Sequence, residues 1–124
     1  MRMKRERLLF VCTANIDRSP TAESLYAGDP RYEVLSAGVA AFAVVPISKR
    51  ILEWADRVFV MCEREDLHQT LLRLRFPDVD RPVVDLDIED RWRRGDPELV
   101  RRLLKELRPF LGPPQTRSGS GSGG

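Results

Sequence analysis

Short apolar segments that alternate with helical patterns are the feature that most restricts how this chain folds. Four such segments have the composition of strands buried on both faces of a sheet; they are residues 8–11, 34–35, 58–61 and 83–84. A helical pattern follows each one, at about residues 21–26, 48–54, 63–74 and from 97 onward. Because a helix between two strands carries the chain back across one face of the sheet, this order predicts an α/β fold with an open parallel sheet and helices on both faces.

Cap residues predict where the helices begin. Ser19 and Asp96 are each followed by proline, a pair typical of an N-cap and the first helical position, and Ser48 is a third candidate cap. Apolar residues then recur at helical spacing in the last helix, namely Val100, Leu103, Leu104, Leu107 and Leu111. Residues 12–19 therefore connect the first strand to the first helix, and ligands of open parallel sheets bind at such connections.

The length of 124 residues allows one domain and is short for two. We expect a single domain over residues 1–114 and a flexible, linker-like tail over residues 115–124, which is rich in glycine and serine. The basic start of the chain lacks a cleavage-site pattern, and no apolar segment is long enough to cross a bilayer. We therefore expect no secretory signal, no membrane association and a cytoplasmic location.

Charge and cysteine content exclude several classes of protein. The 21 Lys and Arg residues are offset by 19 Asp and Glu, and a net charge of +2 gives no reason to expect a nucleic-acid partner. Cys12 and Cys62 can form at most one bridge, which is no disulfide framework, so both are expected as free thiols. Cys62, Asp66 and His68 lack the spacing of paired metal ligands, so we expect no metal site and no cofactor.

The connection at residues 12–19 has the features of an anion site. A loop of this length before a helix can turn its backbone N–H groups toward one point, where the positive end of the helix adds to their field. Arg18 can then bind two phosphate oxygens through its planar fork. We predict that phosphate is bound by Thr13, Ala14, Asn15, Ile16, Asp17 and Arg18.

The same field favours an ionised sulfur on Cys12, because a nearby helix N-terminus and arginine stabilise a thiolate. Cys12 is therefore the candidate nucleophile, and it needs no histidine base, so His68 is given no role. The Ser19 hydroxyl can donate to the thiolate and support it. Asn15 is expected to tie the loop to its neighbours.

Residues 8–23, which read L-L-F-V-C-T-A-N-I-D-R-S-P-T-A-E, resemble the signature of the low-molecular-weight protein tyrosine phosphatases, in their short prokaryotic branch. Weaker likeness continues at residues 36–38, 54–56 and 87–92. The resemblance implies a four-stranded parallel sheet in a three-layer α/β/α, flavodoxin-like architecture. It also implies hydrolysis of phosphotyrosine proteins or small aryl phosphates through a phosphocysteine, with phosphate-like anions as inhibitors.

The family places a general-acid aspartate after the fourth strand, usually followed by proline and an aromatic residue. Asp90 fits this pattern through Trp92, although arginine stands at the proline position, and Asp87 is the alternative. Asp96 is assigned to helix capping. The candidate catalytic set is therefore Cys12, Arg18 and Asp90.

Several features leave alternatives open. Many members of the family that this chain resembles have glycine at the position of Ala14, and many have cysteine at the position of Asp17. The Asp17 carboxylate either faces solvent or weakens the binding of doubly charged substrates. Cys62 either bridges to Cys12 or packs as a small apolar residue. Trp92 and Phe42 either wall the pocket or pack against the core.

Two other functions remain as alternatives. Arsenate reduction on the same loop requires further cysteines downstream, and none follows Cys62. A phosphate-binding regulatory module would keep the loop without turnover.

Overall fold

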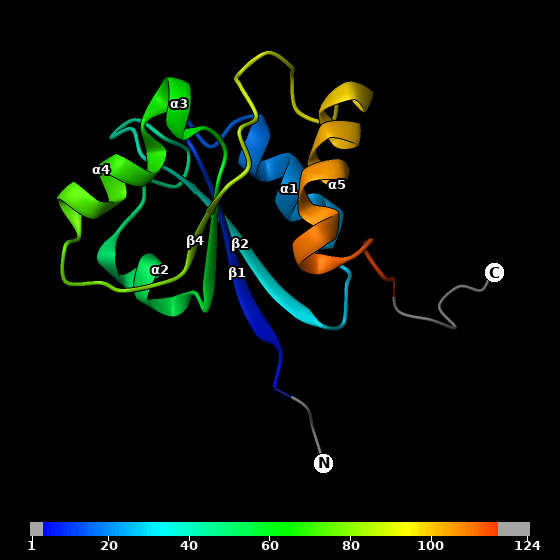
Figure 1. Cartoon of the computed structure of the whole chain (residues 1–124), viewed down its shortest axis with the longest axis horizontal. Helices are drawn as coiled ribbons and strands as arrows, with labels where there is room; N and C mark the ends of the chain where they lie inside the picture. The colour runs from blue at the N-terminus through cyan, green and yellow to red at the C-terminus, as the bar shows by residue number, and fades with distance from the viewer. Residues whose placement is uncertain (1–3, 117–124) are drawn as a thin grey trace.

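The computed structural model describes residues 4–116, which form an open parallel sheet between two layers of helices (Figure 1). The strands are β1 (Glu6–Cys12), β2 (Tyr32–Gly38), β3 (Arg57–Val60) and β4 (Val83–Asp85), in the spatial order β2-β1-β3-β4. Every neighbouring pair is parallel. The predicted three-layer α/β/α fold with a four-stranded parallel sheet is confirmed. Of the predicted tail, residues 117–124 lie outside the described residues, as do residues 1–3.

Side chains of the central strand β1 alternate between two hydrophobic cores. Leu8 and Phe10 face one core, Leu9 and Val11 face the other, and all four are fully buried. This burial on both faces explains why β1 reads as a continuous apolar segment. The helices are α1 (Arg18–Tyr26), α2 (Lys49–Trp54), α3 (Glu63–Asp66), α4 (His68–Arg75) and α5 (Pro97–Leu111).

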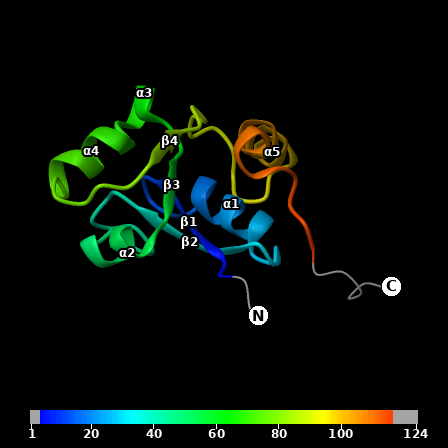
Figure 2. The ribbon, with the colours of Figure 1, turned by 60° about the horizontal axis from the view of Figure 1, so that its bottom comes forward.

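The helices divide between the two faces as the cores require (Figure 2). α1 and α5 cover the face of Leu8 and Phe10, and α2 and α4 cover the face of Leu9 and Val11. On α5, Leu103, Leu107 and Leu111 are buried as predicted, whereas Leu99, and not Val100, completes the buried stripe.

Two of the three predicted helix caps are present. The Asp96 carboxylate accepts the Glu98 N–H at 2.8 Å, and the Ser48 hydroxyl accepts the Ile51 N–H at 3.2 Å. The prediction that Ser19 caps α1 is wrong, because the helix already begins at Arg18 and Ser19 lies fully buried in its first turn. Its hydroxyl is therefore free to face the sulfur of Cys12.

The single helix predicted over residues 63–74 is divided in two. Leu67 adopts a left-handed backbone conformation (φ 56°) that ends α3 and precedes α4. The Glu63 carboxylate reaches past this break and accepts the Thr70 N–H at 2.9 Å, which supplies the amino end of α4 with an acceptor. The break turns His68 inward, where it is fully buried.

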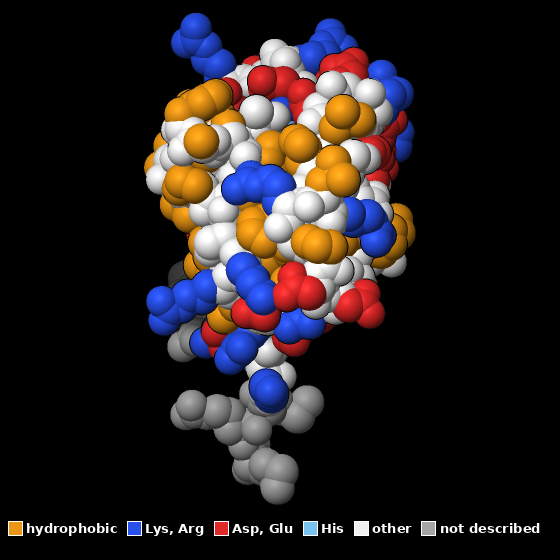
Figure 3. Space-filling view, turned by 90° about the vertical axis from the view of Figure 1, so that its left-hand side faces the viewer, with side chains coloured by type: hydrophobic (Ala, Val, Ile, Leu, Met, Phe, Trp, Pro, Cys, Tyr) orange, Lys and Arg blue, Asp and Glu red, His pale blue; other side chains and the backbone are white. Residues whose placement is uncertain are grey.

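The outer surface beside α4 is chemically mixed, with hydrophobic side chains lying among basic and acidic ones (Figure 3). Leu74 of α4, for example, is largely exposed. Among the helices of residues 4–116, none has the length and apolar character needed to cross a membrane.

Candidate active site

The loop of residues 12–19, here named the Cys12 loop, lies at the carboxyl end of β1 and leads into α1. β1 has β2 on one side and β3 on the other, so the order in which successive strands are added to the sheet changes side at this strand. Open parallel sheets bind their ligands at this kind of position.

In the backbone of the Cys12 loop, several carbonyl groups accept hydrogen bonds, whereas the amides donate none within the described residues. Three of its carbonyl groups accept amide hydrogens from a neighbouring segment: Cys12 from Val39 at 2.9 Å, Thr13 from Ala40 at 3.0 Å and Ala14 from Val44 at 3.1 Å. By contrast, the six amides of residues 13–18 donate to no acceptor within residues 4–116. Unbound amides at the start of a helix are the donors that an anion nest requires.

Asn15 holds the loop in its turned conformation. Its backbone is left-handed (φ 57°), a region that asparagine tolerates better than most residues. Its side-chain amide donates to Ser19 Oγ and to Ser36 Oγ, both at 2.9 Å, and its carbonyl oxygen accepts the Val45 N–H at 3.2 Å. These contacts agree with the expectation that Asn15 ties the loop to its neighbours.

The Cys12 sulfur has a hydroxyl beside it. Ser19 Oγ lies 2.9 Å from Cys12 Sγ and 3.4 Å from the Ala37 carbonyl oxygen. Because Asn15 already donates to this oxygen, the hydroxyl hydrogen of Ser19 is left to donate to the sulfur or to Ala37. The geometry therefore allows the supporting role expected of Ser19.

The Arg18 guanidinium is buried, with one edge occupied and one edge available. Its Nη1 donates to Asp66 Oδ2 at 2.8 Å and to the Ile88 carbonyl oxygen at 3.0 Å. Nε and Nη2 donate no hydrogen bond to an acceptor in the described part of the chain, and Asp90 Oδ1 lies 3.8 Å from Nε. The available edge can take two oxygens of one anion.

His68 lies beneath the loop, a position that sequence reasoning missed. Its Nδ1 accepts the Cys62 N–H at 3.0 Å, so the ring hydrogen is on Nε2, which lies 2.9 Å from Thr13 Oγ1 and donates to it. Burial, with a contribution from the nearby Arg18 charge, lowers the pKa of His68 to about 4. The ring is therefore neutral near pH 7 and joins the loop to the end of β3.

The two candidate acids are in different surroundings. Asp90 is exposed, and its carboxylate lies on the side of Arg18 that faces the Cys12 loop. Asp87 has a left-handed backbone (φ 54°), and its carboxylate is 3.1 Å from Arg64 Nε and 3.8 Å from Cys62 Sγ. The structure thus brings Asp90 to the loop and directs Asp87 toward α3.

A small cavity of about 160 Å³ opens over the loop. It is lined by Cys12, Ala14, Ile16, Asp17, Arg18 and Asp90. Thr13 and Asn15 are absent from this lining, since their side chains point to His68 and Ser36. These two residues can serve an anion through their backbone amides alone.

Other features named from the sequence lie away from this cavity. Cys62 is a free, buried thiol whose pKa is raised by burial, in keeping with packing as a small apolar residue. Trp92 packs against the core beside α5, and Phe42 is largely exposed. Within residues 4–116, no group of three or more His, Cys, Asp or Glu side chains is arranged to hold a metal ion.

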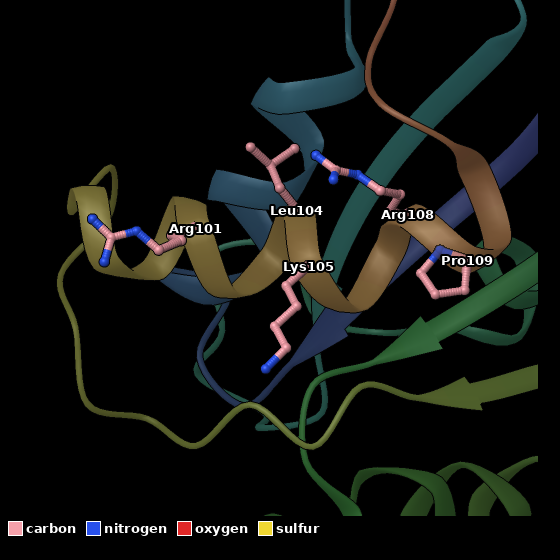
Figure 4. A pocket seen from close by; sticks show the side chains of 5 residues that line it. All are labelled: Arg101, Leu104, Lys105, Arg108 and Pro109. Atoms are coloured by element: carbon pink, nitrogen blue, oxygen red, sulfur yellow. The ribbon is translucent and has the colours of Figure 1, made fainter.

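A larger hollow of about 450 Å³ lies on the outer side of α5 (Figure 4). Its lining comes from this one helix, and the basic side chains of Arg101, Lys105 and Arg108 point in different directions. They do not converge on one point, so this hollow has no anion-binding geometry comparable to that of the Cys12 loop.

Asp66 and His68 are the site residues that sequence reasoning did not find. Both follow the carboxyl end of β3, the strand beside β1, so they meet the Cys12 loop at the same edge of the sheet. Their position just after a predicted strand was the sequence feature that could have placed them near the Cys12 loop. Their partners in the loop are 48 and 55 residues away in sequence, and no local pattern joins them.

The fold and the loop together define a class of protein, a small α/β protein with a cysteine and an arginine at the two ends of a loop whose amides face a cavity; the similar solved structures of this class are phosphatases. Solved structures support this class. The chain is similar to the YwlE arginine phosphatase from Geobacillus stearothermophilus, with 28% identity, a TM-score of 0.65, and coverage of 86% of this chain and 92% of that one. Neither a family model nor a curated protein sequence matches the chain.

Two further structures share the fold. The tyrosine phosphatase Wzb from Escherichia coli K30, in complex with phosphate, is 20% identical with a TM-score of 0.69, and the match covers 86% of this chain and 96% of that one. The low-molecular-weight protein tyrosine phosphatase from T. tengcongensis is 21% identical with a TM-score of 0.65, covering 86% and 99%. The chain therefore shares the fold of the low-molecular-weight protein tyrosine phosphatases.

Proposed function

We propose that this protein hydrolyses phosphotyrosine or related aryl phosphate monoesters through a phosphocysteine formed on Cys12. The observation that carries the proposal is the set of six unbound amides in the loop that begins at Cys12, together with the available edge of Arg18. These groups match the charge and shape of a phosphoryl group, and phosphoryl transfer depends mainly on such positioning and electrostatic stabilisation.

The proposed reaction has two steps. In the first, Cys12 Sγ attacks phosphorus, the P–S bond forms as the P–O bond to the aryl group breaks, and Asp90 gives its proton to the departing oxygen. In the second, Asp90 takes a proton from water as that water attacks phosphorus, and the P–S bond breaks to release inorganic phosphate. Arg18 and the loop amides bind the equatorial oxygens throughout.

The rim of the cavity offers an apolar surface on which an aryl ring can pack. Ile16 lines the cavity and is 53% exposed, which leaves an apolar contact surface beside the site of the phosphate. The carboxylates of Asp17 and Asp90 also line the cavity, and their charge is of the sign that attracts a guanidinium. Because a similar structure is an arginine phosphatase, phosphoarginine is the comparison substrate in the assay.

The two alternative functions have weaker support. Reduction of arsenate would need thiols to relay a disulfide, and the only cysteine after Cys12 is buried and faces Asp87. A binding module without turnover would retain the loop but has no need of a carboxylate at the position of Asp90.

The first test is hydrolysis of para-nitrophenyl phosphate at mildly acidic pH with no added metal. We expect turnover by the natural chain, loss of turnover in Cys12→Ser, and retained binding of vanadate by that variant. Cys62→Ala, which removes the other thiol, is the matched control and should keep turnover. Undiminished hydrolysis by Cys12→Ser would exclude the proposed nucleophile, and vanadate binding without turnover by the natural chain would favour the binding module.

The second test separates the two candidate acids. General acid catalysis contributes about 10² to 10⁴ in rate, so Asp90→Ala should lower kcat by a factor in that range for a substrate with a poor leaving group. Asp87→Ala should have a much smaller effect, because its carboxylate is directed toward Arg64. The reverse ranking would assign the acid to Asp87.

A further inference from the structure

The segment that carries Asp90 is held at both ends by the start of α1. This segment, residues 86–95, joins β4 to α5 without regular secondary structure. At its first end, the Ile88 carbonyl oxygen accepts from Arg18 at 3.0 Å. At its other end, the Arg94 N–H donates to Asp17 Oδ1 at 2.8 Å, and the Gly95 N–H donates to Thr21 Oγ1 at 3.0 Å.

Between these anchors the segment has further contacts. The Arg91 N–H donates to the Glu89 carbonyl oxygen at 3.0 Å, and Trp92 packs against the core. The Glu89 carboxylate lies 3.7 Å from Arg102 Nη1 and 3.8 Å from Arg64 Nη2. The Asp90 side chain is 61% exposed. On the side of Asp90 that leads to α5, the fixed polar contacts of the segment to the start of α1 are those to Asp17 and Thr21.

The carboxylate of Asp17 lies where its charge is unfavourable for phosphate binding, so its position needs another explanation. It lines the cavity in which a phosphate dianion would bind, and like charges at short range repel. Its side chain makes no N-cap hydrogen bond to α1, although Asp17 occupies the N-cap position. It is also in no ion pair with a described residue. Among the described residues, the Arg94 N–H is the hydrogen-bond partner of the Asp17 carboxylate.

We propose that Asp17 is a positioning residue that holds the Asp90 segment over Cys12 through its hydrogen bond to the Arg94 N–H. The two alternatives for Asp17, a group facing solvent or a group that only weakens substrate binding, are replaced by a specific contact. The inference rests on the proposed phosphatase function, because it assigns Asp17 to the step in which Asp90 protonates the leaving oxygen.

The leaving group distinguishes a positioning role from a general structural one. An aryl phosphate with an acidic phenol, such as para-nitrophenyl phosphate, needs little help from an acid, whereas phenyl phosphate needs much more. The ratio kcat/KM reports the steps up to departure of the phenol and excludes hydrolysis of the phosphocysteine, which both esters share. In Asp17→Ala we expect kcat/KM for phenyl phosphate to fall about tenfold or more, because small misplacements of a reacting group cost up to about 10². We expect kcat/KM for para-nitrophenyl phosphate to change by less than about threefold.

Two variants serve as controls. Asp17→Asn keeps a carbonyl oxygen that can accept the Arg94 N–H, so it should recover most of the phenyl phosphate rate lost in Asp17→Ala. Asp56→Ala removes a carboxylate with the same kind of contact, to the Arg7 N–H at 2.9 Å, at the opposite edge of the sheet. It should leave the ratio of the two rates unchanged.

A double-mutant cycle tests whether Asp17 acts through Asp90. In an Asp90→Ala background, Asp17→Ala should cause no further loss with phenyl phosphate, since residues that act through one group are non-additive. Equal losses with both substrates, a full loss in Asp17→Asn, or additive losses in the double variant would each overturn the proposal.

A readout without turnover separates failure of this inference from failure of the phosphatase assignment. The Arg94 amide should exchange with solvent faster in Asp17→Ala than in Asp17→Asn or Asp56→Ala, as measured by NMR. If the natural chain hydrolyses neither ester, the proposed function fails, and the exchange result still decides the contact. Unchanged exchange in Asp17→Ala would overturn it.

Discussion

At the scale of single residues, polar side chains behind the Cys12 loop connect its two ends. His68 binds Thr13 at the start of the loop, and Asp66 binds Arg18 at its end. His68 Nε2 also lies 3.9 Å from Asp66 Oδ2, so these two residues bring both ends of the loop to the same short stretch after β3. Each contact has a measurable consequence.

The buried neutral ring of His68 makes stability depend on pH. Its folded pKa of about 4 lies below the ordinary 6.5, so between these values the unfolded chain binds a proton that the folded chain does not. The contribution of the neutral His68 ring to the free energy of unfolding should therefore be fully present above pH 6.5 and should decrease as the pH falls toward 4. The histidine contribution lost by pH 4.5 is about 2 kcal/mol.

Urea unfolding at pH 7.5 and pH 4.5 measures this loss. His68→Asn cannot take up a proton, so its free energy of unfolding should fall by about 2 kcal/mol less between the two pH values than that of the natural chain. The comparison is clean because His68 is the single histidine. Parallel pH dependence in the two proteins would show that the ring is not held neutral.

Asp66 is expected to orient Arg18. In Asp66→Ala the buried guanidinium loses the carboxylate that is hydrogen-bonded to Nη1, and Nη1 keeps the Ile88 carbonyl, so the edge offered to phosphate should become misaligned. We expect kcat/KM for para-nitrophenyl phosphate to fall about tenfold and stability to fall by about 2 kcal/mol. Glu65→Ala, on the same short helix but paired with exposed Arg64, is the control and should change neither. Equal kinetic effects of the two variants would contradict this role.

The sequence identifies residues whose role follows from neighbours along the chain. Cys12 and Arg18 are recognisable because a strand, a loop and a helix follow one another without interruption around them. Asp17, Asp66 and His68 are different, since their partners are 48 to 77 residues distant and become neighbours only when the strands are ordered. A local pattern carries no information about such contacts.

At the scale of elements, the end of β2 limits where the Cys12 loop can lie. A Cβ atom added at Gly38 would be 2.7 Å from Ala43 Cβ and 3.0 Å from the Asn15 nitrogen, and it would also press on the Thr13 carbonyl oxygen. Backbone atoms of the loop cannot yield to this contact without moving the loop itself. Gly38 therefore sets the close approach of β2 to the site.

Gly38→Ala should for this reason disturb activity as well as stability. Overpacking of this kind costs about 1 to 3 kcal/mol, and displaced loop amides should lower kcat/KM by about tenfold or more. Gly28→Ala is the matched control, because an added Cβ there meets no atom within 4 Å. Chemical denaturation and ester hydrolysis measure both effects, and a Gly38→Ala protein with natural turnover would show that the loop tolerates displacement.

Element types were predictable from the sequence, whereas two boundaries were not. The apolar strands and the caps Ser48 and Asp96 depend on local composition, and the structure contains them. The start of α1 was misplaced because Ser19 has the composition of a cap but faces the sulfur instead. The break at Leu67 was missed because leucine rarely adopts a left-handed backbone, and because the Glu63 contact to Thr70 that spans the turn is not visible in local composition.

At the scale of the whole molecule, the site draws on nearly every part of the fold. β1 and α1 supply the Cys12 loop, the stretch after β3 supplies Asp66 and His68, and the segment between β4 and α5 supplies Asp90. This explains why the predicted sheet gave the place of the site but not its full membership. It also means that an anion bound by the Cys12 loop is linked to folding of the entire domain.

An anion that binds only the folded chain should therefore stabilise it globally. The gain is about 2.7 kcal/mol at one hundred times the dissociation constant, which for a domain of this size raises Tm by several degrees. Orthovanadate is the suitable probe, because it is active at concentrations too low for general salt effects on stability. We expect Tm to rise with vanadate for the natural chain and for Cys62→Ala, and to stay constant for Arg18→Gln, which removes the charged fork. Chloride at matched ionic strength should have no effect. A shift of equal size in Arg18→Gln would mean that vanadate binds without the charged fork of Arg18, and no shift in the natural chain would mean that the Cys12 loop does not form an anion site.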